Sequence, residues 1–288
     1  MSTPDIGAAA QFLAAGSRVL DRRRFERLFA DGDNGSVRDA VAAYRNPDGG
    51  FGHGLEPDAR TPGSQPAAIE HALRVLDEAD AWDAELVGGA CGWLQANAPA
   101  EGGAAFAEAT VAGWPHAPWW VPEPGHPASV PPTGQIAGTL HARGVLHPWL
   151  DRATELLWTR IAKLADSAPG PYDLRGVLRF LDFVPDRERA ERALDTVAPV
   201  LLDVVTLDPH ASGETHSPLD FAPLPGSLAR PVFDLEVISA QLDHLAAGQQ
   251  DDGGWTFNWL AWSPAAERDW RGSITVDALA VLRANERL

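Results

Sequence analysis

The chain has 288 residues, of which 45% are hydrophobic and 22% are charged, a composition typical of a globular protein and not of a disordered one. Its formal net charge is −17 and no basic block occurs in it, which argues against a nucleic-acid partner and against an anionic membrane surface. A single cysteine, Cys91, excludes an internal disulfide and fits a reducing compartment.

The N-terminus lacks the early positive charge of a signal peptide, and no apolar run approaches the roughly 20 residues that cross a bilayer. We therefore expect a cytoplasmic protein without an integral membrane segment. Apolar residues then recur at spacings of three and four, as on an amphipathic helix, and no convincing alternation indicates a strand. The predicted helices span residues 7–29, 36–45, 64–79, 83–97, 128–143, 148–165, 172–184, 187–205, 231–248 and 273–286.

The connections between these helices alternate between short and long. The chain turns within a few residues around Ala81, Leu146 and Pro185, which predicts antiparallel helical hairpins. Stacked hairpins bury their faces on each other, so we expect an all-α fold: an α/α toroid of about five to six hairpins that forms a single domain over residues 1–288. The long connections, which would gather at one mouth of the toroid, are 46–63, 98–127, 206–230 and 250–272.

One short motif occurs twice, some two hundred residues apart. Residues 45–51 and 249–255 each place an acid, two glycines and an aromatic ring in one order, directly after a predicted helix. Asp58-Ala59-Arg60 and Asp269-Trp270-Arg271 then precede an apolar helix in both places. A fixed order of this kind is the signature of a repeat architecture. The predicted unit is a helix, an acid-Gly-Gly-aromatic turn, a long loop, Asp-x-Arg and a second helix.

Both turns resemble the QW repeat of the terpenoid cyclase and protein prenyltransferase toroids. Gln249-x-x-x-Gly253-x-Trp255 matches that repeat in full, whereas the first copy departs from it at Arg45 and Phe51. A degenerate third copy runs from Trp93 to Gly103. The resemblance implies an α/α toroid in which the glutamine and the aromatic ring tie the end of an outer helix to its neighbour.

The chemical signatures of that superfamily are mostly missing. Class II cyclases of the squalene-hopene type start with Asp-x-Asp-Asp, and the nearest match, Asp234-Leu235-Glu236-Val237, lacks the second adjacent acid. Cys91 has no acid two residues before it, as the zinc site of a protein prenyltransferase requires, and one cysteine is too few for a lanthipeptide cyclase. The diphosphate-binding Asp-rich motif of class I synthases is absent too. We expect neither a metal nor another cofactor.

The densest polar cluster contains His53, Glu56, Asp58 and Arg60. Two carboxyl groups beside a histidine and an arginine suit acid–base catalysis, because the arginine holds one carboxylate ionised while burial keeps the other protonated. The alternative is structural: Asp58 caps the next helical turn and Arg60 braces it, which the recurrence of Asp-x-Arg favours. Glu236 is a further candidate proton donor, or a first-turn acid favoured by the helix dipole.

Tryptophans are concentrated in two of the long loops. They suggest an aromatic rim over a cavity, which would stabilise a carbocation by cation–π attraction or line a pocket for an apolar ligand, with Arg60 beside it. Their positions are Trp114, Trp119 and Trp120 in one loop, and Trp255, Trp259, Trp262 and Trp270 in the other.

Three functions fit these residues. The first is acid-initiated cyclisation of an isoprenoid, or other processing of it, by Glu56, Asp58 or Glu236. The second is a non-catalytic protein that binds an apolar small molecule or serves as a scaffold. The third is a carbohydrate-active (α/α)-barrel enzyme with two carboxylates facing across a sugar. The sequence does not indicate an oligomeric state.

Overall fold

The computed structural model describes residues 3–288, and helices dominate it, as the sequence predicts. The expectation of an all-α fold is confirmed. Two compact units divide the chain: one comprises the residues up to Ser36 together with Leu202–Leu288, and the other comprises Val37–Leu201. We call them the terminal unit and the central unit. A single domain over residues 1–288 stays a prediction.

The central unit consists of helical hairpins and one very short pair of strands. Its elements are α3 (Asn34–Ala42), α4 (Pro66–Glu78), α5 (Ala84–Ala96), β1 (Ala104–Ala105), a 3-10 turn (Ala109–Gly113), β2 (Ala128–Ser129), α6 (Val130–Ala142), α7 (Pro148–Ile161), a 3-10 turn (Leu164–Asp166), α8 (Pro171–Phe183) and α9 (Arg187–Val204). Helices α3 and α9 run a few residues across the boundary between the units.

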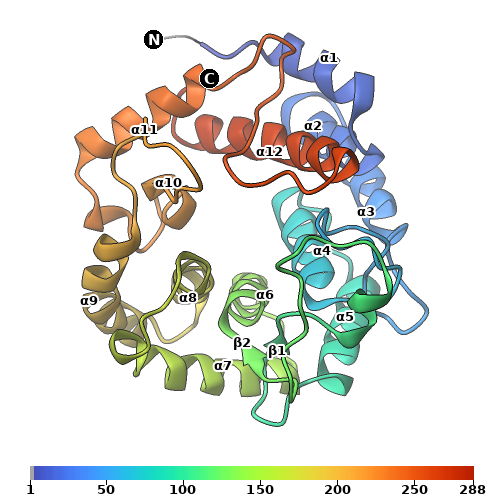
Figure 1. The fold of residues 1–288 in the computed structure, drawn as a ribbon, viewed down its shortest axis with the longest axis vertical. Helices are drawn as coiled ribbons and strands as arrows, with labels where there is room; N and C mark the ends of the chain where they lie inside the picture. The colour runs from blue at the N-terminus through green and yellow to red at the C-terminus, as the bar shows by residue number, and fades with distance from the viewer. Residues whose placement is uncertain (1–2) are drawn as a thin grey trace. The chain divides into compact units, whose positions relative to one another are not determined.

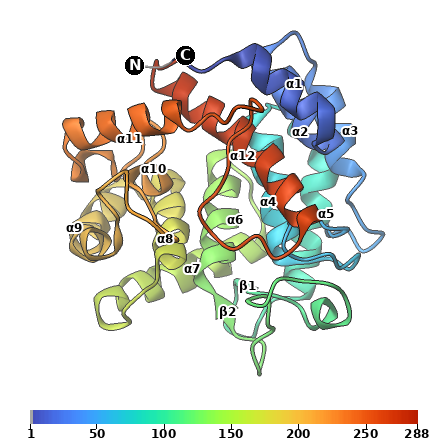
Figure 2. The same cartoon turned by 45° about the horizontal axis from the view of Figure 1, so that its top comes forward.

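The terminal unit joins the two ends of the chain. Its elements are α1 (Ile6–Gly16), α2 (Val19–Phe29), α10 (Pro218–Phe221), a 3-10 turn (Arg230–Val232), α11 (Leu235–Ala247) and α12 (Pro264–Ala284). Figure 2 shows α1, α2 and α12 side by side, and these helices contact one another.

Glycines set the spacing between two neighbouring helices of the central unit. Figure 1 shows α4, α6 and α8 next to one another, and α6 contacts both of the others. A Cβ atom on Gly134 would lie 2.3 Å from the Gly176 carbonyl oxygen, and one on Gly138 would lie 2.4 Å from that of Arg179. No side chain fits at these positions, so the backbones of α6 and α8 meet directly.

Three expectations about the elements are corrected. The helix predicted over 7–29 is broken, because Ser17 and Arg18 adopt extended conformations and the chain turns there into α2. A helix predicted from residue 273 begins at Pro264, where the Ser263 side chain caps it by accepting from the Ala266 N–H. Strands β1 and β2 have two residues each, too few to produce the alternation that marks a strand in sequence.

The short connections lie where the sequence places them. Helices α4 and α5 are joined by residues 79–83, α6 and α7 by 143–147, and α8 and α9 by 184–186. In the central unit the long connections precede α4 and α6, at 43–65 and 97–129, and they contact each other. A short helix at Pro218–Phe221 interrupts the long connection predicted at 206–230.

The two Gly-Gly turns have one backbone conformation. In the first, the Asn46 N–H donates to the Gly50 carbonyl at 2.8 Å; in the second, Gln250 donates to Gly254 at 2.8 Å. The leading glycine of each turn has a positive φ, +88° at Gly49 and +90° at Gly253, which favours glycine. The acid before it accepts from the second glycine's N–H in both turns. The repeat in the sequence is therefore a repeat in backbone geometry.

Each turn packs against a different helix of its own unit. A Cβ atom on Gly49 would lie 2.8 Å from the Gly89 oxygen on α5, and one on Gly253 would lie 2.3 Å from the Ala8 oxygen on α1. The degenerate third copy behaves alike, since a Cβ on Gly102 would lie 3.3 Å from Arg152 of α7.

Candidate active site

The loop that follows the first Gly-Gly turn leaves its stem and returns to it. A Cβ atom on Gly52 would lie only 2.3 Å from the Pro62 carbonyl oxygen, so the outgoing and returning strands of the loop touch. The Gln65 N–H donates to the Phe51 carbonyl at 2.9 Å and closes the stem just before α4 begins. Residues 53–61 thus form a compact Ω-like loop whose ends are fixed.

This loop carries two buried carboxyl side chains. Glu56 is 4% exposed and Asp58 is 5% exposed. Glu56 Oε1 accepts a hydrogen bond of 3.1 Å from the Asp58 N–H, and Glu56 Oε2 lies 3.3 Å from Nδ1 of His71 on α4. Burial of a charged group is costly unless it is paired, and these two contacts provide partners for the Glu56 carboxyl.

The geometry around His71 assigns its hydrogen. Nδ1 lies 3.2 Å from the Ala67 carbonyl oxygen, which only accepts, and 3.3 Å from Glu56 Oε2. Nδ1 therefore carries a hydrogen and donates to both oxygens. Glu56 thus accepts from a backbone N–H and from an imidazole N–H.

A second loop covers the acids. The Arg60 N–H donates to the Pro115 carbonyl at 2.9 Å, and the Ala117 N–H donates to the Asp58 carbonyl at 2.8 Å. The Gln65 side chain joins the two loops again, since its Nε2 donates to Thr110 Oγ1 at 2.8 Å. The cluster of Glu56, Asp58 and His71, which we call the acid cluster, therefore lies between α4 and the loop of residues 106–120.

The covering loop carries three of the predicted tryptophans. Trp120 is buried and stacks on Phe106, with ring centroids 4.8 Å apart. Trp114 and Trp119 are 50% and 40% exposed. All three lie within a few positions of Pro115 and Ala117, the residues whose backbones bond to Arg60 and Asp58.

The fold was compared with known proteins. No family model and no curated protein matches the chain. Among solved structures, a protein from Actinoplanes covers 98% of this chain and 89% of its own at 15% identity, with a TM-score of 0.56. Type II terpene cyclase MstE from Scytonema, in complex with its substrate geranylgeranyl dihydroxybenzoate, covers 98% of this chain and 87% of its own at 12% identity, with a TM-score of 0.52. The chain has the fold of the type II terpene cyclases.

A second MstE structure, without ligand, gives the same coverage at 12% identity and a TM-score of 0.54. These likenesses confirm the terpenoid-cyclase-like fold that the repeats predict. Within residues 3–288, no helix is long and apolar enough to cross a membrane. The same residues hold no group of three or more His, Cys, Asp or Glu side chains that could bind a metal.

The other predicted site residues lie apart from the acid cluster or beside it. His53 is exposed at the start of the loop, with Nε2 2.9 Å from Asn46 Oδ1. Arg60 is half-buried and lies against Gly54. Glu236 is exposed in the first turn of α11, in the terminal unit.

The tryptophans of the second loop belong to the terminal unit. Trp255 is buried and its indole N–H donates to the Leu245 carbonyl at 2.8 Å, a contact that fixes the end of α11. Trp259 lies edge-on to Trp270, which is part of α12 and not of the loop. Trp262 is half-buried, and its indole nitrogen is buried with no hydrogen bond among residues 3–288.

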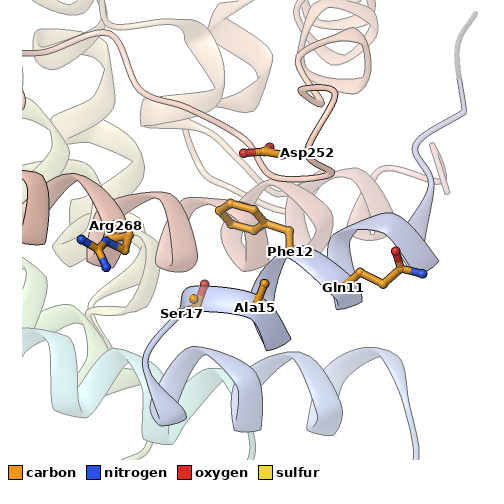
Figure 3. Close-up of a pocket in the computed structure, with 7 residues that line it drawn as sticks. Gln11, Phe12, Ala15, Ser17, Asp252 and Arg268 are labelled. Carbon is orange, nitrogen blue, oxygen red and sulfur yellow. The ribbon is translucent and has the colours of Figure 1, made fainter.

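A surface hollow of the terminal unit lies beside the second Gly-Gly turn. Figure 3 shows it between α1 and α12, with Phe12, Asp252 and Arg268 around it. Its volume is about 430 Å³, and none of the predicted site residues lines it. Arg271, which bonds to Asp252, also lies over the Phe12 ring at 4.7 Å.

The predicted equivalence of the two Asp-x-Arg motifs is wrong. Asp58 and Arg60 lie in the loop before α4, whereas Asp269 and Arg271 lie inside α12, because α12 begins six residues sooner after its turn than α4 does. Arg271 reaches back to Asp252 with two bonds of 2.8 Å. The brace of the second repeat thus joins the helix to the turn.

His71 was not predicted as a site residue. It is one of nine histidines, and its position on α4 faces the loop only because the loop folds back over that helix. Glu70 and Arg74 were missed as well, although their spacing of four on a predicted helix places them on one face.

Proposed function

We propose that the chain is a class II type isoprenoid cyclase whose acid lies in the acid cluster. The observation that carries this proposal is the burial of two carboxyl side chains, 4% and 5% exposed, beneath an aromatic loop in a chain with the type II terpene cyclase fold. An apolar small molecule as substrate and a cytoplasmic location belong to the same proposal.

The two acids have different roles in it. Glu56 accepts two hydrogen bonds, one from His71, and is the ionised partner. Asp58 is the proton donor, because a second buried carboxyl beside an ionised one keeps its proton more readily. Environments that separate two neighbouring carboxyl groups in this way assign the acid and its partner.

The reaction begins with transfer of a proton from Asp58 to an alkene carbon or an epoxide oxygen of the substrate. The O–H bond of the carboxyl breaks, the π pair or the oxygen lone pair forms the new bond to hydrogen, and a positive charge is left on the substrate. With an alkene, the charge lies on the carbon next to the protonated one; with an epoxide, the bond between the protonated oxygen and a ring carbon breaks. A second double bond attacks the electron-deficient carbon and closes a ring. Loss of a proton then ends the sequence, so that product and alkene substrate have equal mass.

Aromatic rings are suited to hold the developing charge. Trp120 with Phe106, and the half-exposed Trp114 and Trp119, accompany the acids on the covering loop. The face of an indole attracts a cation through the ring quadrupole. Arg60 is assigned to the same site because its side chain lies against Gly54 of the loop that carries the acids.

A mass-spectrometric turnover assay tests the proposal. Squalene, oxidosqualene and geranylgeranyl diphosphate are incubated with the protein and with Asp58→Asn, Glu56→Gln and Glu236→Gln. We expect a cyclised product of unchanged mass, lost about 10²- to 10⁴-fold in Asp58→Asn, as for removal of a general acid. Glu236→Gln, on an exposed helix turn, is the matched control and should retain activity.

The assay also separates the other functions. Cleavage of added oligosaccharides would instead support a carbohydrate-active enzyme. Retention of an isoprenoid through gel filtration without turnover would support a binding protein. Full activity in both Asp58→Asn and Glu56→Gln would contradict the assigned site.

A further inference from the structure

Four charged residues of the central unit lie on one face of two helices. Glu70 and Arg74 are four residues apart on α4, and Arg175 and Arg179 are four apart on α8, so each pair occupies one side of its helix. We call this set the arginine face. It gathers three positive charges in a chain whose net charge is −17.

The charges of the three arginines act on one carboxyl group, that of Glu70. Burial raises the pKa of Glu70, although the charges of Arg74, Arg175 and Arg179 act to lower it. The arginine face therefore sets three positive charges against a single acid.

Glycine packing builds this face. Because Gly138 has no side chain, the backbone of α8 at Arg179 lies against α6. Arg179 therefore reaches over α6, with Nη2 3.0 Å from Asp77 Oδ2 on α4 and 3.2 Å from Thr139 Oγ1. Asp77 in turn accepts from Arg143 Nε at 2.6 Å. Arg179 is thus fixed in place before any ligand arrives.

Arg175 differs from Arg179 in having no such anchor. Its guanidinium lies 5.8 Å from the Tyr172 ring and makes no hydrogen bond or ion pair with residues 3–288. Arg175 is nevertheless only half-exposed. A guanidinium has five N–H donors in a planar fork, and their best partners are carboxylate and phosphate oxygens.

We propose that the arginine face binds the anionic group, a carboxylate or a phosphate, of a small-molecule ligand, with Arg175 as the residue that binds it directly. Arg179 and Arg74 supply the surrounding positive field. Glu70 is the internal counter-ion of this face, and where it is ionised its charge competes with that of the ligand.

The arginine face adjoins the acid cluster through α4. Glu70 and His71 are consecutive on that helix, and His71 contacts Glu56. Residues one apart on a helix point about 100° from each other, so the two sites lie on neighbouring sides of α4. A ligand with an isoprenoid chain and an anionic group at its polar end fits this layout. That the apolar part of the ligand is an isoprenoid rests on the proposed function.

The competing interpretation is structural: the arginines hold the helices together and bind nothing. That interpretation predicts a loss of stability, not of ligand affinity, when an arginine is removed. It applies to Arg179, which bonds to Asp77 and Thr139, and not to Arg175, which bonds to neither. Arg175 is therefore the residue to change.

Titration calorimetry with two simple probes tests the proposal on the full chain. Sodium benzoate and inorganic pyrophosphate are titrated into the protein and into Arg175→Gln, Arg175→Lys and Arg38→Gln. Loss of a charge-assisted contact should weaken binding about tenfold or more in Arg175→Gln, with Arg175→Lys between it and the unchanged protein. Arg38 is an exposed arginine of the same unit and serves as the control for net charge.

The probe affinity of the Glu70→Gln variant is an independent test. Removing the internal counter-ion should leave probe affinity unchanged where Glu70 is protonated and increase it where Glu70 is ionised. Chemical denaturation of every variant shows that the protein is folded. Weaker binding in Glu70→Gln would overturn the assignment of Glu70 as a counter-ion.

Each outcome of the titrations decides the proposal. Binding of benzoate alone identifies a carboxylate site, binding of pyrophosphate alone a phosphate site, and either result supports the proposal if Arg175→Gln loses it. No binding of either probe, or equal weakening in Arg38→Gln, overturns it. These titrations need no turnover. A protein that binds the probes but has no cyclase activity would therefore contradict the cyclase proposal and leave the anion-binding proposal standing.

Discussion

The two Gly-Gly turns have one backbone and two different surroundings. In the second, Asp252 is held by Arg271 of α12, and the next residues form an exposed aromatic loop. In the first, Asp48 accepts from Ser64, and the next residues form the loop that buries Glu56 and Asp58. The repeat therefore duplicates the scaffold, while the acids occur in one copy only. Residues that a repeat does not reproduce are the better candidates for chemistry.

The largest effect should come from adding one methyl group at the turn glycine. Gly253→Ala forces a non-glycine residue to φ +90° and brings Cβ to 2.3 Å from Ala8 O, whereas Gly49→Ala meets Gly89 O at 2.8 Å. We expect the free energy of unfolding to fall by about 3 kcal/mol or more in Gly253→Ala and somewhat less in Gly49→Ala. Urea denaturation measures both.

Gly213→Ala separates the two causes of that loss. Gly213 has φ +89° but no atom within 4 Å of its would-be Cβ, so only the backbone cost of about 1–2 kcal/mol applies. If Gly213→Ala destabilises as much as Gly253→Ala, the contact with α1 contributes nothing and the comparison fails.

The residue at the start of each turn should differ in importance. Gln249 accepts from the Asp5 N–H at 2.7 Å and donates to the carbonyls of Asp5 and Gly253. Arg45 makes one ion pair of 2.7 Å with Glu85, whose side chain is 82% exposed. We expect Gln249→Ala to cost about 2 kcal/mol of unfolding free energy and Arg45→Ala about 0.5 kcal/mol. An equal loss of unfolding free energy in the two variants would mean that Gln249 and Arg45 contribute equally to stability.

The aromatic residue of the turn offers a smaller test. Trp255→Phe keeps a ring but removes the N–H that donates to the Leu245 carbonyl, so it should cost about 1 kcal/mol. Phe51 is fully buried in the equivalent place, and Phe51→Trp should also destabilise, because its pocket has no room for a larger ring. Thermal melting followed by circular dichroism is sufficient, and a stabilised Phe51→Trp would show that the two pockets are alike.

The smallest effect concerns pH. The Arg271 hydrogen bonds lower the pKa of Asp252, with the Gly254 N–H adding to this. Its ionised form therefore stabilises the folded state above the unfolded pKa, and this stabilisation is lost as the pH falls through the lowered folded value. Asp252→Asn should lower the free energy of unfolding by less than about 1 kcal/mol at neutral pH. It should have no effect at a pH below the lowered pKa of Asp252 in the folded state.

Asp251→Asn is the matched control for that titration. Asp251 is the exposed neighbour in the same turn and makes no hydrogen bond with residues 3–288. Unfolding curves at neutral and acid pH should therefore coincide for Asp251→Asn and the unchanged protein. A cost for Asp252→Asn that stays constant across the range would contradict its link to ionisation.

Most helices could be predicted from the sequence because amphipathic periodicity and proline at the first turn are local signals. The ends of α4 and α8 lie within two residues of the prediction for that reason. The repeat could be predicted too, because each turn has a residue of positive φ, and the glycine that this conformation requires is visible in the sequence. The break at Ser17 could not, because both flanking segments have helical periodicity and the packing of α12 beside it is decided by residues 250 positions away.

The candidate site was predicted in part. Glu56 and Asp58 lie within one polar segment, so their proximity follows from the sequence. Their contact with His71 does not, since it depends on how a loop returns over α4. His53 shows the converse: it is close to the acids in sequence and yet exposed at the start of the loop, where two successive residues of positive φ, His53 and Gly54, turn the chain.

The hydrogen bonds between Gln249 and Asp5 join residues 244 positions apart. Helices α1 and α2 are therefore synthesised before the central unit, whereas α11 and α12, which belong to the same unit as α1 and α2, are synthesised after it. Contacts of such long range form late, because the chain between them must be ordered first. The central unit has all its elements available before α11 and α12 exist, so synthesis favours its folding while α1 and α2 still lack the helix they pack against. A chain stalled on the ribosome before residue 249 would contain α1 and α2 without α12, the helix against which both of them pack.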